Sequence, residues 1–193
     1  QYNLGICYAN GQGVAQDQAK AAELYGKAAD QGYMAAQFAL GFCYANGQGV
    51  AQDQAKAAEW YGKAAAQGLG AAQVNLGSCY ANGQGVAKDA AKAFEWYRKA
   101  ADQGYAVAQS TLALFYDLGK GVARDLEKAM VWYRKAADQG YAQAQYNLGI
   151  CYINGEGVTT NYAKAAEWLT KAAAQNDADA AQTLEKMKAD GLI

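Results

Sequence analysis

The amino-acid sequence predicts an all-α protein, an α-solenoid of five helix-turn-helix repeats of 36 residues followed by a C-terminal capping helix. The first observation is a leucine that recurs every 36 residues, at Leu4, Leu40, Leu76, Leu112, Leu148 and Leu184. The second is composition, because the chain lacks proline and is rich in alanine, which has the highest helix propensity. The third is size: one hairpin of this length cannot bury its apolar faces alone, so neighbouring repeats are expected to stack.

Similar sequence surrounds each of the first five leucines and sets the repeat borders. The copies read LGICYANGQGV, LGFCYANGQGV, LGSCYANGQGV, LALFYDLGKGV and LGICYINGEGV. We therefore expect one solenoid domain over residues 1–193, with repeats at 1–36, 37–72, 73–108, 109–144 and 145–180. Residues 181–193 carry added charges beside Leu184 and are expected to form a polar capping helix.

The first helix of each repeat is illustrated by residues 35–46. Apolar side chains there follow the i, i+4, i+7, i+8 spacing of one helical face, at Ala36, Leu40, Cys43 and Tyr44. Gly47 follows this segment and is expected to end the helix in a left-handed conformation. Gly41 lies inside the helix, where glycine costs about 0.5 to 1 kcal/mol relative to alanine, and it predicts close approach by a partner helix.

The second helix is expected to start after a capping side chain that accepts hydrogen bonds from free backbone N–H groups. The predicted caps are Asp17, Asp53, Asp89, Asp125 and Asn161. The spacing i, i+3, i+4, i+7 predicts a packing face formed by Ala57, Trp60, Tyr61 and Ala64. On the opposite face, Glu59 and Lys63 form a favourable i, i+4 pair worth about 0.2 to 0.5 kcal/mol.

Composition excludes several classes of function. The 17 Lys and Arg balance 18 Asp and Glu, so the net charge of −1 gives no electrostatic footprint for nucleic acid or an anionic membrane. Because the chain has no histidine, imidazole serves neither as general base nor as metal ligand. The four cysteines lie at multiples of 36 residues from one another, so we expect buried free thiols rather than disulfides or a zinc cluster.

Motifs for catalysis or cofactor binding are also missing. The Gly-x-Gly of the turns lacks the third glycine of a dinucleotide loop, and Gly119-Lys120-Gly121 does not fit the P-loop pattern. Ser78 and Ser110 are the only serines, and neither is followed three residues later by the lysine that a β-lactamase nucleophile requires. We therefore expect a non-catalytic protein that uses no cofactor and no metal.

The pattern AxxxLGxxYxxGxGVxxDxxKAxxWYxKAAxQG, repeated over essentially the whole chain, resembles the Sel1-like repeat (SLR) family, relatives of the tetratricopeptide repeat. The resemblance implies a right-handed superhelix of helical hairpins that assembles protein complexes and has no catalytic residues. Bacterial members are often exported or membrane-associated, and eukaryotic members act in endoplasmic-reticulum quality control. One disulfide-rich branch, with members linked to penicillin binding, places a cysteine pair in each repeat, whereas this chain has at most one per repeat.

Residues 1–20 show no secretory signal, and no apolar run reaches the roughly 20 residues needed to span a bilayer. We therefore expect no direct membrane insertion. For a bacterial member of such a family, the expected location is the periplasm or the exterior if an upstream signal was removed, and the cytoplasm otherwise.

By resemblance to tetratricopeptide arrays, the first helix of each hairpin lines a concave groove. Opposite its packing face lie residues that vary between repeats at spacing i, i+4, i+8: Tyr2, Ile6, Asn10, Phe38, Phe42, Asn46, Val74, Ser78, Asn82, Ser110, Leu114, Leu118, Tyr146, Ile150 and Asn154. Apolar pockets for a peptide or an amphipathic helix are expected at Tyr2, Phe38, Phe42, Tyr146 and Ile150. The alternative is that these side chains fill the interior or the contact between adjacent first helices. The asparagines either reach a bound peptide backbone or simply end their helices.

Three functions remain open at this point. The first is a scaffold or adaptor whose groove holds a protein or peptide, and the second is a penicillin- or peptidoglycan-fragment-binding protein with weak hydrolase activity. The third is an idealised array without a dedicated ligand, which the identity of residues 7–23 with residues 43–59 favours. The sequence of the fourth repeat differs most from the others, and either a binding-specificity site or neutral sequence drift would explain the difference. The sequence does not indicate an oligomeric state.

Overall fold

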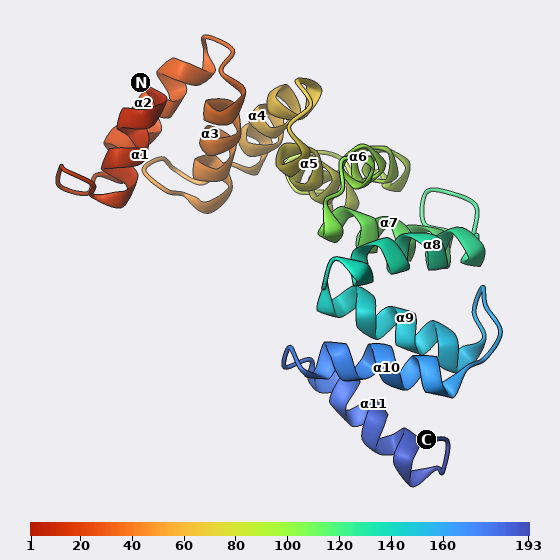
Figure 1. The fold of residues 1–193 in the computed structure, drawn as a ribbon. Coiled ribbons are helices and arrows are strands. Elements are labelled where there is room, and N and C mark those ends of the chain that lie inside the picture. The colour runs from red at the N-terminus through yellow and green to blue at the C-terminus, as the bar shows by residue number, and fades with distance from the viewer. The chain divides into compact units, whose positions relative to one another are not determined.

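The computed structural model describes residues 1–193 as eleven α-helices with no strand (Figure 1). The helices are α1 (Tyr2–Asn10), α2 (Gln18–Ala29), α3 (Met34–Asn46), α4 (Gln54–Ala66), α5 (Gly70–Asn82), α6 (Ala90–Asp102), α7 (Ala106–Leu118), α8 (Leu126–Asp138), α9 (Ala142–Asn154), α10 (Tyr162–Ala173) and α11 (Ala178–Ala189). The helices α1, α3, α5, α7 and α9 are the first helices of five hairpins, and α2, α4, α6, α8 and α10 are the second helices. The predicted all-α repeat fold is confirmed.

The hairpins are shifted relative to the expected repeat borders. The first helices α3, α5, α7 and α9 begin at residues 34, 70, 106 and 142, so the border expected after residue 36 falls inside the first turn of α3. Helix α11 begins at Ala178, before the expected residue 181, because the Asp177 carboxylate accepts a hydrogen bond from Ala180 N at 2.9 Å. The capping helix therefore takes the place of a sixth first helix and ends at Ala189.

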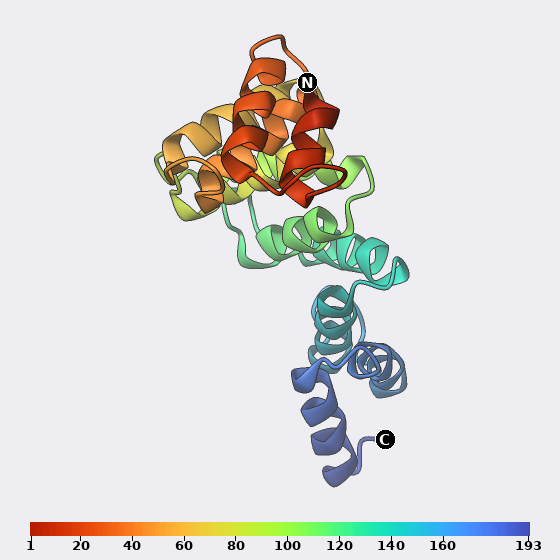
Figure 2. The same cartoon turned by 90° about the vertical axis from the view of Figure 1, so that its left-hand side faces the viewer.

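The chain divides into two compact units, residues 1–96 and 97–193, each with its own buried core. In the first unit, Tyr61 and Leu76 belong to a cluster against which Trp96 packs. In the second unit, Tyr133, Leu148 and Leu169 are fully buried. There α10 packs against both α9 and α11, which can be followed in Figures 1 and 2. The tryptophans thus contribute to packing, as the spacing of the second helices predicts.

The predicted helix ends are present. Asp53 Oδ1 accepts a hydrogen bond from Lys56 N at 3.0 Å at the start of α4. Equivalent capping bonds are made by Asp17, Asp89, Asp125 and Asn161. Gly47 ends α3 in the left-handed conformation, with φ of 69°. Gly41 approaches the second helix closely, since a Cβ atom there would lie 2.8 Å from Tyr61 Cδ1.

All four cysteines are free, and Cys43, Cys79 and Cys151 are buried. Burial raises the pKa of these three thiols, that of Cys151 to about 12, so they remain protonated at neutral pH. They act as small apolar side chains in the core. None of the eleven helices combines the length and the apolar character needed to cross a membrane.

Buried glutamines link each hairpin to the one before it, a feature that the sequence pattern alone does not reveal. Gln37, Gln73, Gln109 and Gln145 are only 4 to 5% exposed. Each donates to a carbonyl near the end of the preceding second helix, as Gln145 Nε2 does to Ala137 O at 3.1 Å. Gln145 Oε1 accepts from Gln175 Nε2 at 2.9 Å, and Gln175 also donates to Gly140 O at 2.9 Å. Each such pair adds a side-chain donor at the helix end, where the carbonyl also accepts a backbone hydrogen bond, as Ala137 O does from Gly140 N at 3.0 Å.

Replacing Gln145 with leucine is expected to lower the free energy of unfolding by about 1 to 3 kcal/mol, because two hydrogen bonds are lost: Gln145 no longer donates to Ala137 O, which keeps only its bond from Gly140 N, and Gln175 Nε2 loses its acceptor. Gln143→Leu on the same helix is the matched control, since Gln143 is exposed and bonds only to Asn147 within α9. Its effect should stay within about 0.5 kcal/mol. Denaturant titration measures both, and equal effects would contradict a coupling role for the buried glutamine.

The stability of the protein should be constant near neutral pH and fall in alkali. No histidine is present to titrate between about pH 5 and 8. Burial raises the pKa of Tyr61 from 10.0 to about 12. Between about pH 10 and 12 the unfolded chain therefore loses this proton while the folded chain keeps it, so the free energy of unfolding decreases as pH rises. Denaturant titrations at about pH 8, 10 and 11 test this sign, and unchanged stability at the highest pH would contradict it.

Candidate functional site

All predicted binding residues except Ser110 are exposed or half-buried on the first helices, and we call the surface they form the first-helix face. The exposed members are Asn10, Phe42, Asn46, Asn82, Leu114, Leu118 and Asn154. The half-buried members are Tyr2, Ile6, Phe38, Val74, Ser78, Tyr146 and Ile150. Among the exposed residues, Phe42, Leu114 and Leu118 leave 44%, 40% and 64% of their surface open to solvent. Large apolar side chains on this face are therefore accessible to a partner.

Ser110 contradicts the prediction, because it is only 5% exposed and does not present its side chain to a ligand. The equivalent positions in α3 and α9 hold the larger Phe38 and Tyr146, which are half-buried. A small side chain at such a position is covered completely by its neighbours. Ser110 is therefore a packing residue of α7.

Several of the predicted aromatic residues also contribute to the interior. The Phe38 ring packs against Tyr61, with ring centroids 5.7 Å apart. The Tyr2 ring lies 5.6 Å from that of Tyr25, and Tyr146 packs against the core of the second unit. These three side chains therefore pack largely in the interior, which was the alternative to a role in ligand binding. The apolar side chains that a ligand could reach are those of Phe42 and the two leucines of α7.

One cavity brings three of the predicted residues together within residues 1–96. Phe42 and Asn46 of α3 and Ser78 of α5 line a hollow of about 250 Å³. Its other lining residues are Ala45, Gln54, Tyr61, Asn75, Cys79 and Gln84. Burial raises the pKa of both Tyr61 and Cys79, so no lining side chain is charged at neutral pH. The cavity is a neutral pocket with amide, hydroxyl and aromatic groups.

Hydrogen bonds within the protein orient the amides of this cavity. Asn46 Nδ2 donates to Phe42 O at 2.9 Å, and Gln54 Nε2 donates to Ala45 O at 3.0 Å. Asn82 Nδ2 donates to Ser78 Oγ at 3.2 Å. The asparagines at the ends of α3 and α5 thus bond within their own helices, as expected for helix-end residues. Each amide also has a carbonyl oxygen that is able to accept a hydrogen bond from a ligand N–H group.

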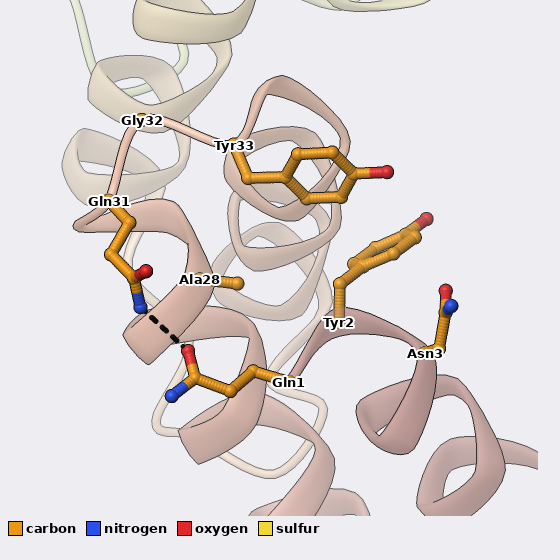
Figure 3. Close-up of a pocket in the computed structure, with 7 residues that line it drawn as sticks. All are labelled: Gln1, Tyr2, Asn3, Ala28, Gln31, Gly32 and Tyr33. Atoms are coloured by element: carbon orange, nitrogen blue, oxygen red, sulfur yellow. Dashed lines mark hydrogen bonds between the residues drawn. The ribbon is translucent and has the colours of Figure 1, made fainter.

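A larger hollow of about 540 Å³ lies at the start of α1, beside Tyr2 (Figure 3). Tyr2 and Tyr33 meet edge to face there, with centroids 5.1 Å apart, and Gln31 Nε2 donates to Gln1 Oε1 at 2.8 Å. In the second hairpin, Met34 in the first turn of α3 packs on the core.

Tyr146 lines a third hollow, of about 530 Å³, between α9 and α11. Helix α11 contributes Asp179, Gln182, Thr183, Glu185, Lys186 and Ala189 to its wall. The capping helix thus adds charges to a surface that is otherwise almost free of them. Helices α1, α3, α5 and α9 contain no charged residue, and α7 contains only Asp117.

The second helices present a different surface. Glu59 Oε1 and Lys63 Nζ form the predicted ion pair at 2.7 Å, and Glu23 pairs with Lys27 at 2.5 Å. Lys63 Nζ also lies 3.8 Å from the centroid of the Trp60 ring. Paired charges and lysine-covered tryptophan rings occupy much of this surface, although Val131 of α8 is 53% exposed. The first helices expose more large apolar residues and carry almost no charge, so the first-helix face is the better candidate for recognition.

The surroundings of the two serines do not assist hydrolysis. The partner of Ser78 Oγ is the Asn82 amide, which is not a base, and Ser110 is buried. A nucleophilic serine needs a base within hydrogen-bonding reach. The structure also places no group of three or more Cys, Asp or Glu where it could hold a metal ion.

The sequence reasoning missed Gln54, Asn75 and Gln84 in the wall of the neutral cavity. Asparagine recurs in two other first helices at the position of Asn75, as Asn3 and Asn147, and that recurrence is the signal that would have found it. Asn75 and Tyr61 line the same cavity. The first-helix face therefore has an amide at a position next to the predicted ones.

Comparison with solved structures gives close matches over most of the chain. A protective antigen of uropathogenic Escherichia coli that displays an SLR fold is 39% identical, with a TM-score of 0.95 over 99% of this chain and 41% of that protein. A Sel1 repeat protein from Oxalobacter formigenes is 34% identical, with a TM-score of 0.89 over 96% of this chain and 74% of that one. Cysteine rich protein B of Helicobacter pylori is 30% identical, with a TM-score of 0.55 over 69% of this chain and 96% of that one.

The chain thus spans less than half the length of the Escherichia coli antigen. Comparison with curated proteins gives no match. The pattern of the Sel1 repeat family matches residues 1–33, 35–69, 70–105, 106–141 and 142–177, and these matches follow the helical hairpins. Proteins of this family are generally non-catalytic scaffolds for protein–protein interaction. The chain belongs to the Sel1 repeat family.

Proposed function

We propose that this protein is a non-catalytic scaffold that binds a segment of another protein on its first-helix face. The observation that carries the proposal is the exposure of Phe42, Leu114 and Leu118 on helices whose inward leucines are buried. A helix needs its inward face for packing, but exposed large apolar residues on the opposite face contribute little to folding. Their accessibility supports a role in contacting a partner.

The amide-lined cavity beside Phe42 supports the same proposal. It offers an aromatic surface together with oriented hydrogen-bonding groups from α3, α4 and α5. Recognition of a peptide requires apolar anchors for side chains and polar groups for the backbone. A peptide side chain seated against Phe42 would place its backbone near the Asn46 and Gln54 carbonyl oxygens.

Phe42→Ser is expected to weaken peptide binding at least about tenfold, or about 1.4 kcal/mol, while helicity stays unchanged. The probe is a peptide selected from a displayed random library on the immobilised full chain, with its affinity measured by titration calorimetry. Phe38→Ser should instead lower the melting temperature, because the Phe38 ring packs on Tyr61.

Glu59→Gln on α4 is the matched control, since Glu59 is exposed on a second helix. Its affinity for the selected peptide should equal that of the unmodified chain. A peptide that binds Phe42→Ser normally and loses affinity with Glu59→Gln would place recognition on the second helices and contradict the proposal.

A further inference from the structure

The exposed side of helix α8 differs at its centre from that of the other second helices. Val131 leaves 53% of its surface open to solvent, whereas the other four second helices have glutamate at this position, Glu23, Glu59, Glu95 and Glu167. Because a charged residue occupies the same place in four hairpins, packing does not require valine there. An exposed apolar residue flanked by charges has the composition of the centre and rim of a protein interface.

The neighbours of Val131 along α8 carry opposite charges on its two sides. Glu127 lies four residues before Val131 and Lys135 lies four residues after it, and all three side chains are exposed. Residues spaced by four form one ridge on the surface of a helix. We call these three residues the α8 ridge. It carries a negative, an apolar and a positive side chain, in that order.

The two charges of the α8 ridge have no ionic partner within the chain. In the second hairpin the lysine equivalent to Lys135 pairs with the glutamate four residues before it, since Lys63 Nζ lies 2.7 Å from Glu59 Oε1. Val131 replaces that glutamate in α8, and Lys135 Nζ lies 3.9 Å from the centroid of the Trp132 ring. Glu127 is in no ion pair, and alanine occupies its position in the other second helices, at Ala19, Ala55, Ala91 and Ala163.

This order of charges is complementary to itself when two copies of α8 run antiparallel. A twofold axis at Val131 places the two valines side by side and brings Glu127 of each copy to Lys135 of the other. Ridges of residues spaced by four pack along one another in the commonest class of helix contact. In the other second helices the same axis would bring two glutamates together, as at Glu59, and their like charges would repel. Self-pairing is therefore specific to α8.

Two further exposed cations of α8 already have partners in their own chain. Lys128 Nζ lies 2.8 Å from Asp125 Oδ2, and an Arg134 guanidinium nitrogen donates to the Tyr152 hydroxyl of α9. The same twofold axis would place Lys128 of one copy near Arg134 of the other. Because the charge of Lys128 is balanced by Asp125, the repulsion there is weaker than the attraction between the unpaired ridge charges.

A hollow of about 380 Å³ adjoins the α8 ridge and extends the apolar part of its surface. Met130 and Val131 of α8 lie in its wall together with Val158, which belongs to the turn between α9 and α10. The other lining residues are Glu127, Arg134, Lys135, Asp138 and Gly157. The valine of a second copy is therefore able to contact the turn as well as the helix.

We propose that the α8 ridge is the contact surface of a symmetric, antiparallel dimer of this chain. One helix per copy is a small contact beside the roughly 800 Å² per partner of a stable interface, so the dissociation constant should be about 0.01 to 1 mM. The first-helix faces are not part of this contact. A dimer therefore has two recognition surfaces and would hold a bivalent partner more tightly than a monomer does.

Sedimentation equilibrium of the full chain from about 5 µM to 1 mM covers the expected range of dissociation constants. We expect a monomer–dimer equilibrium whose dissociation constant rises at least about threefold between about 0.05 and 0.5 M NaCl, because salt screens the ion pairs. Val131→Glu restores the residue of the other second helices and should weaken the dimer at least about tenfold. Val107→Glu is the matched control, since Val107 is 45% exposed on the first helix α7, and it should leave the dimer unchanged.

Charge reversal tests the predicted pairing itself. Glu127→Lys and Lys135→Glu should each weaken self-association at least about tenfold, because like charges then meet at both ends of the α8 ridge. An equimolar mixture of these two variants should associate within about threefold of the unmodified chain, because every pair between the two variants is again of opposite charge. Poor folding of a variant would not give this recovery, and circular dichroism checks the helicity of each.

Three results would overturn the inference. The first is a chain that stays monomeric at about 1 mM, which would show that a second copy does not occupy the α8 ridge. The second is a dimer that Val131→Glu leaves intact. The third is a mixture of the two charge-reversed variants that associates no better than either alone. Peptide binding that depends on Phe42 is measured separately, so none of these results decides the proposed scaffold function.

Discussion

Replacing Gly49 with alanine is expected to detach the first hairpin from the second. Gly49 follows α3 with φ of +71°, and a Cβ atom there would lie 1.9 Å from Gln18 O and 2.3 Å from Gln18 C at the start of α2. Because the blocking atoms belong to the backbone, no side-chain rotation relieves the overlap. The loop and α2 must move apart, at a cost of about 3 kcal/mol or more.

Gly13→Ala is the matched control for Gly49→Ala. Gly13 occupies the equivalent place in the first hairpin with φ of +73°, and a Cβ atom there would meet no atom within 4 Å. It should cost only the backbone strain of about 1 to 2 kcal/mol. In a repeat array, the interface between neighbouring repeats contributes to stability separately from each repeat's own folding. Loss of the contact with the Gly49 loop should therefore destabilise the terminal hairpin, so Gly49→Ala should reduce hydrogen-exchange protection most in α1 and α2. Equal protection in the two variants would show that this loop does not couple the hairpins.

Alanine substitutions at Gly41 and Gly62 are expected to change stability in opposite directions. A Cβ atom on Gly41 would lie 2.8 Å from Tyr61 Cδ1 and 3.3 Å from Ala57 O, so Gly41→Ala should destabilise by about 1 to 3 kcal/mol. Gly62 lies in α4 with no atom within 4 Å of such a Cβ. Gly62→Ala should stabilise by about 0.5 to 1 kcal/mol, because alanine is the better helix former.

The fourth hairpin shows that the destabilisation by Gly41→Ala should be limited. Ala113 occupies the position of Gly41 there, on the first helix that pairs with α8 and its fully buried Tyr133. One Cβ atom is thus tolerated at this place after neighbouring groups adjust, so Gly41→Ala should remain folded. Denaturant titration of both variants measures the two signs, and stabilisation by Gly41→Ala would contradict close helix approach as the reason for this glycine.

The elements whose determinants are local in sequence were predicted well. Asp53 caps the helix that immediately follows it, and Gly47 ends the helix that immediately precedes it, so three or four neighbouring residues contain the relevant chemistry. The inward position of Leu40 follows from helical spacing within one turn or two. Because the same caps, helix-ending glycines and apolar spacing recur in five repeats, the repeat architecture could be predicted from the sequence.

Features that join different hairpins were not predictable in the same way. The bond from Gln175 to Gln145 spans 30 residues. Glutamine recurs every 36 residues at both positions, but this recurrence does not show which groups the side chains bond. The repeat borders expected after residues 36 and 72 fall inside the first turns of α3 and α5, because Tyr33 and Leu69 precede these helices without a side-chain cap to mark their start. Ser110 was misassigned because helical spacing gives the direction of a side chain but not the coverage supplied by neighbouring helices.

The measurement that tests the central claim most directly is side-chain footprinting of the full chain with and without a bound selected peptide. If the first-helix face is the recognition surface, carbene labelling should fall at Phe42 or at Leu114 and Leu118, whose side chains are exposed. Labelling at Val131, which is exposed on a second helix, should not change. Protection confined to Val131 and the neighbouring surface of α8, with full labelling of α3 and α7, would contradict the account.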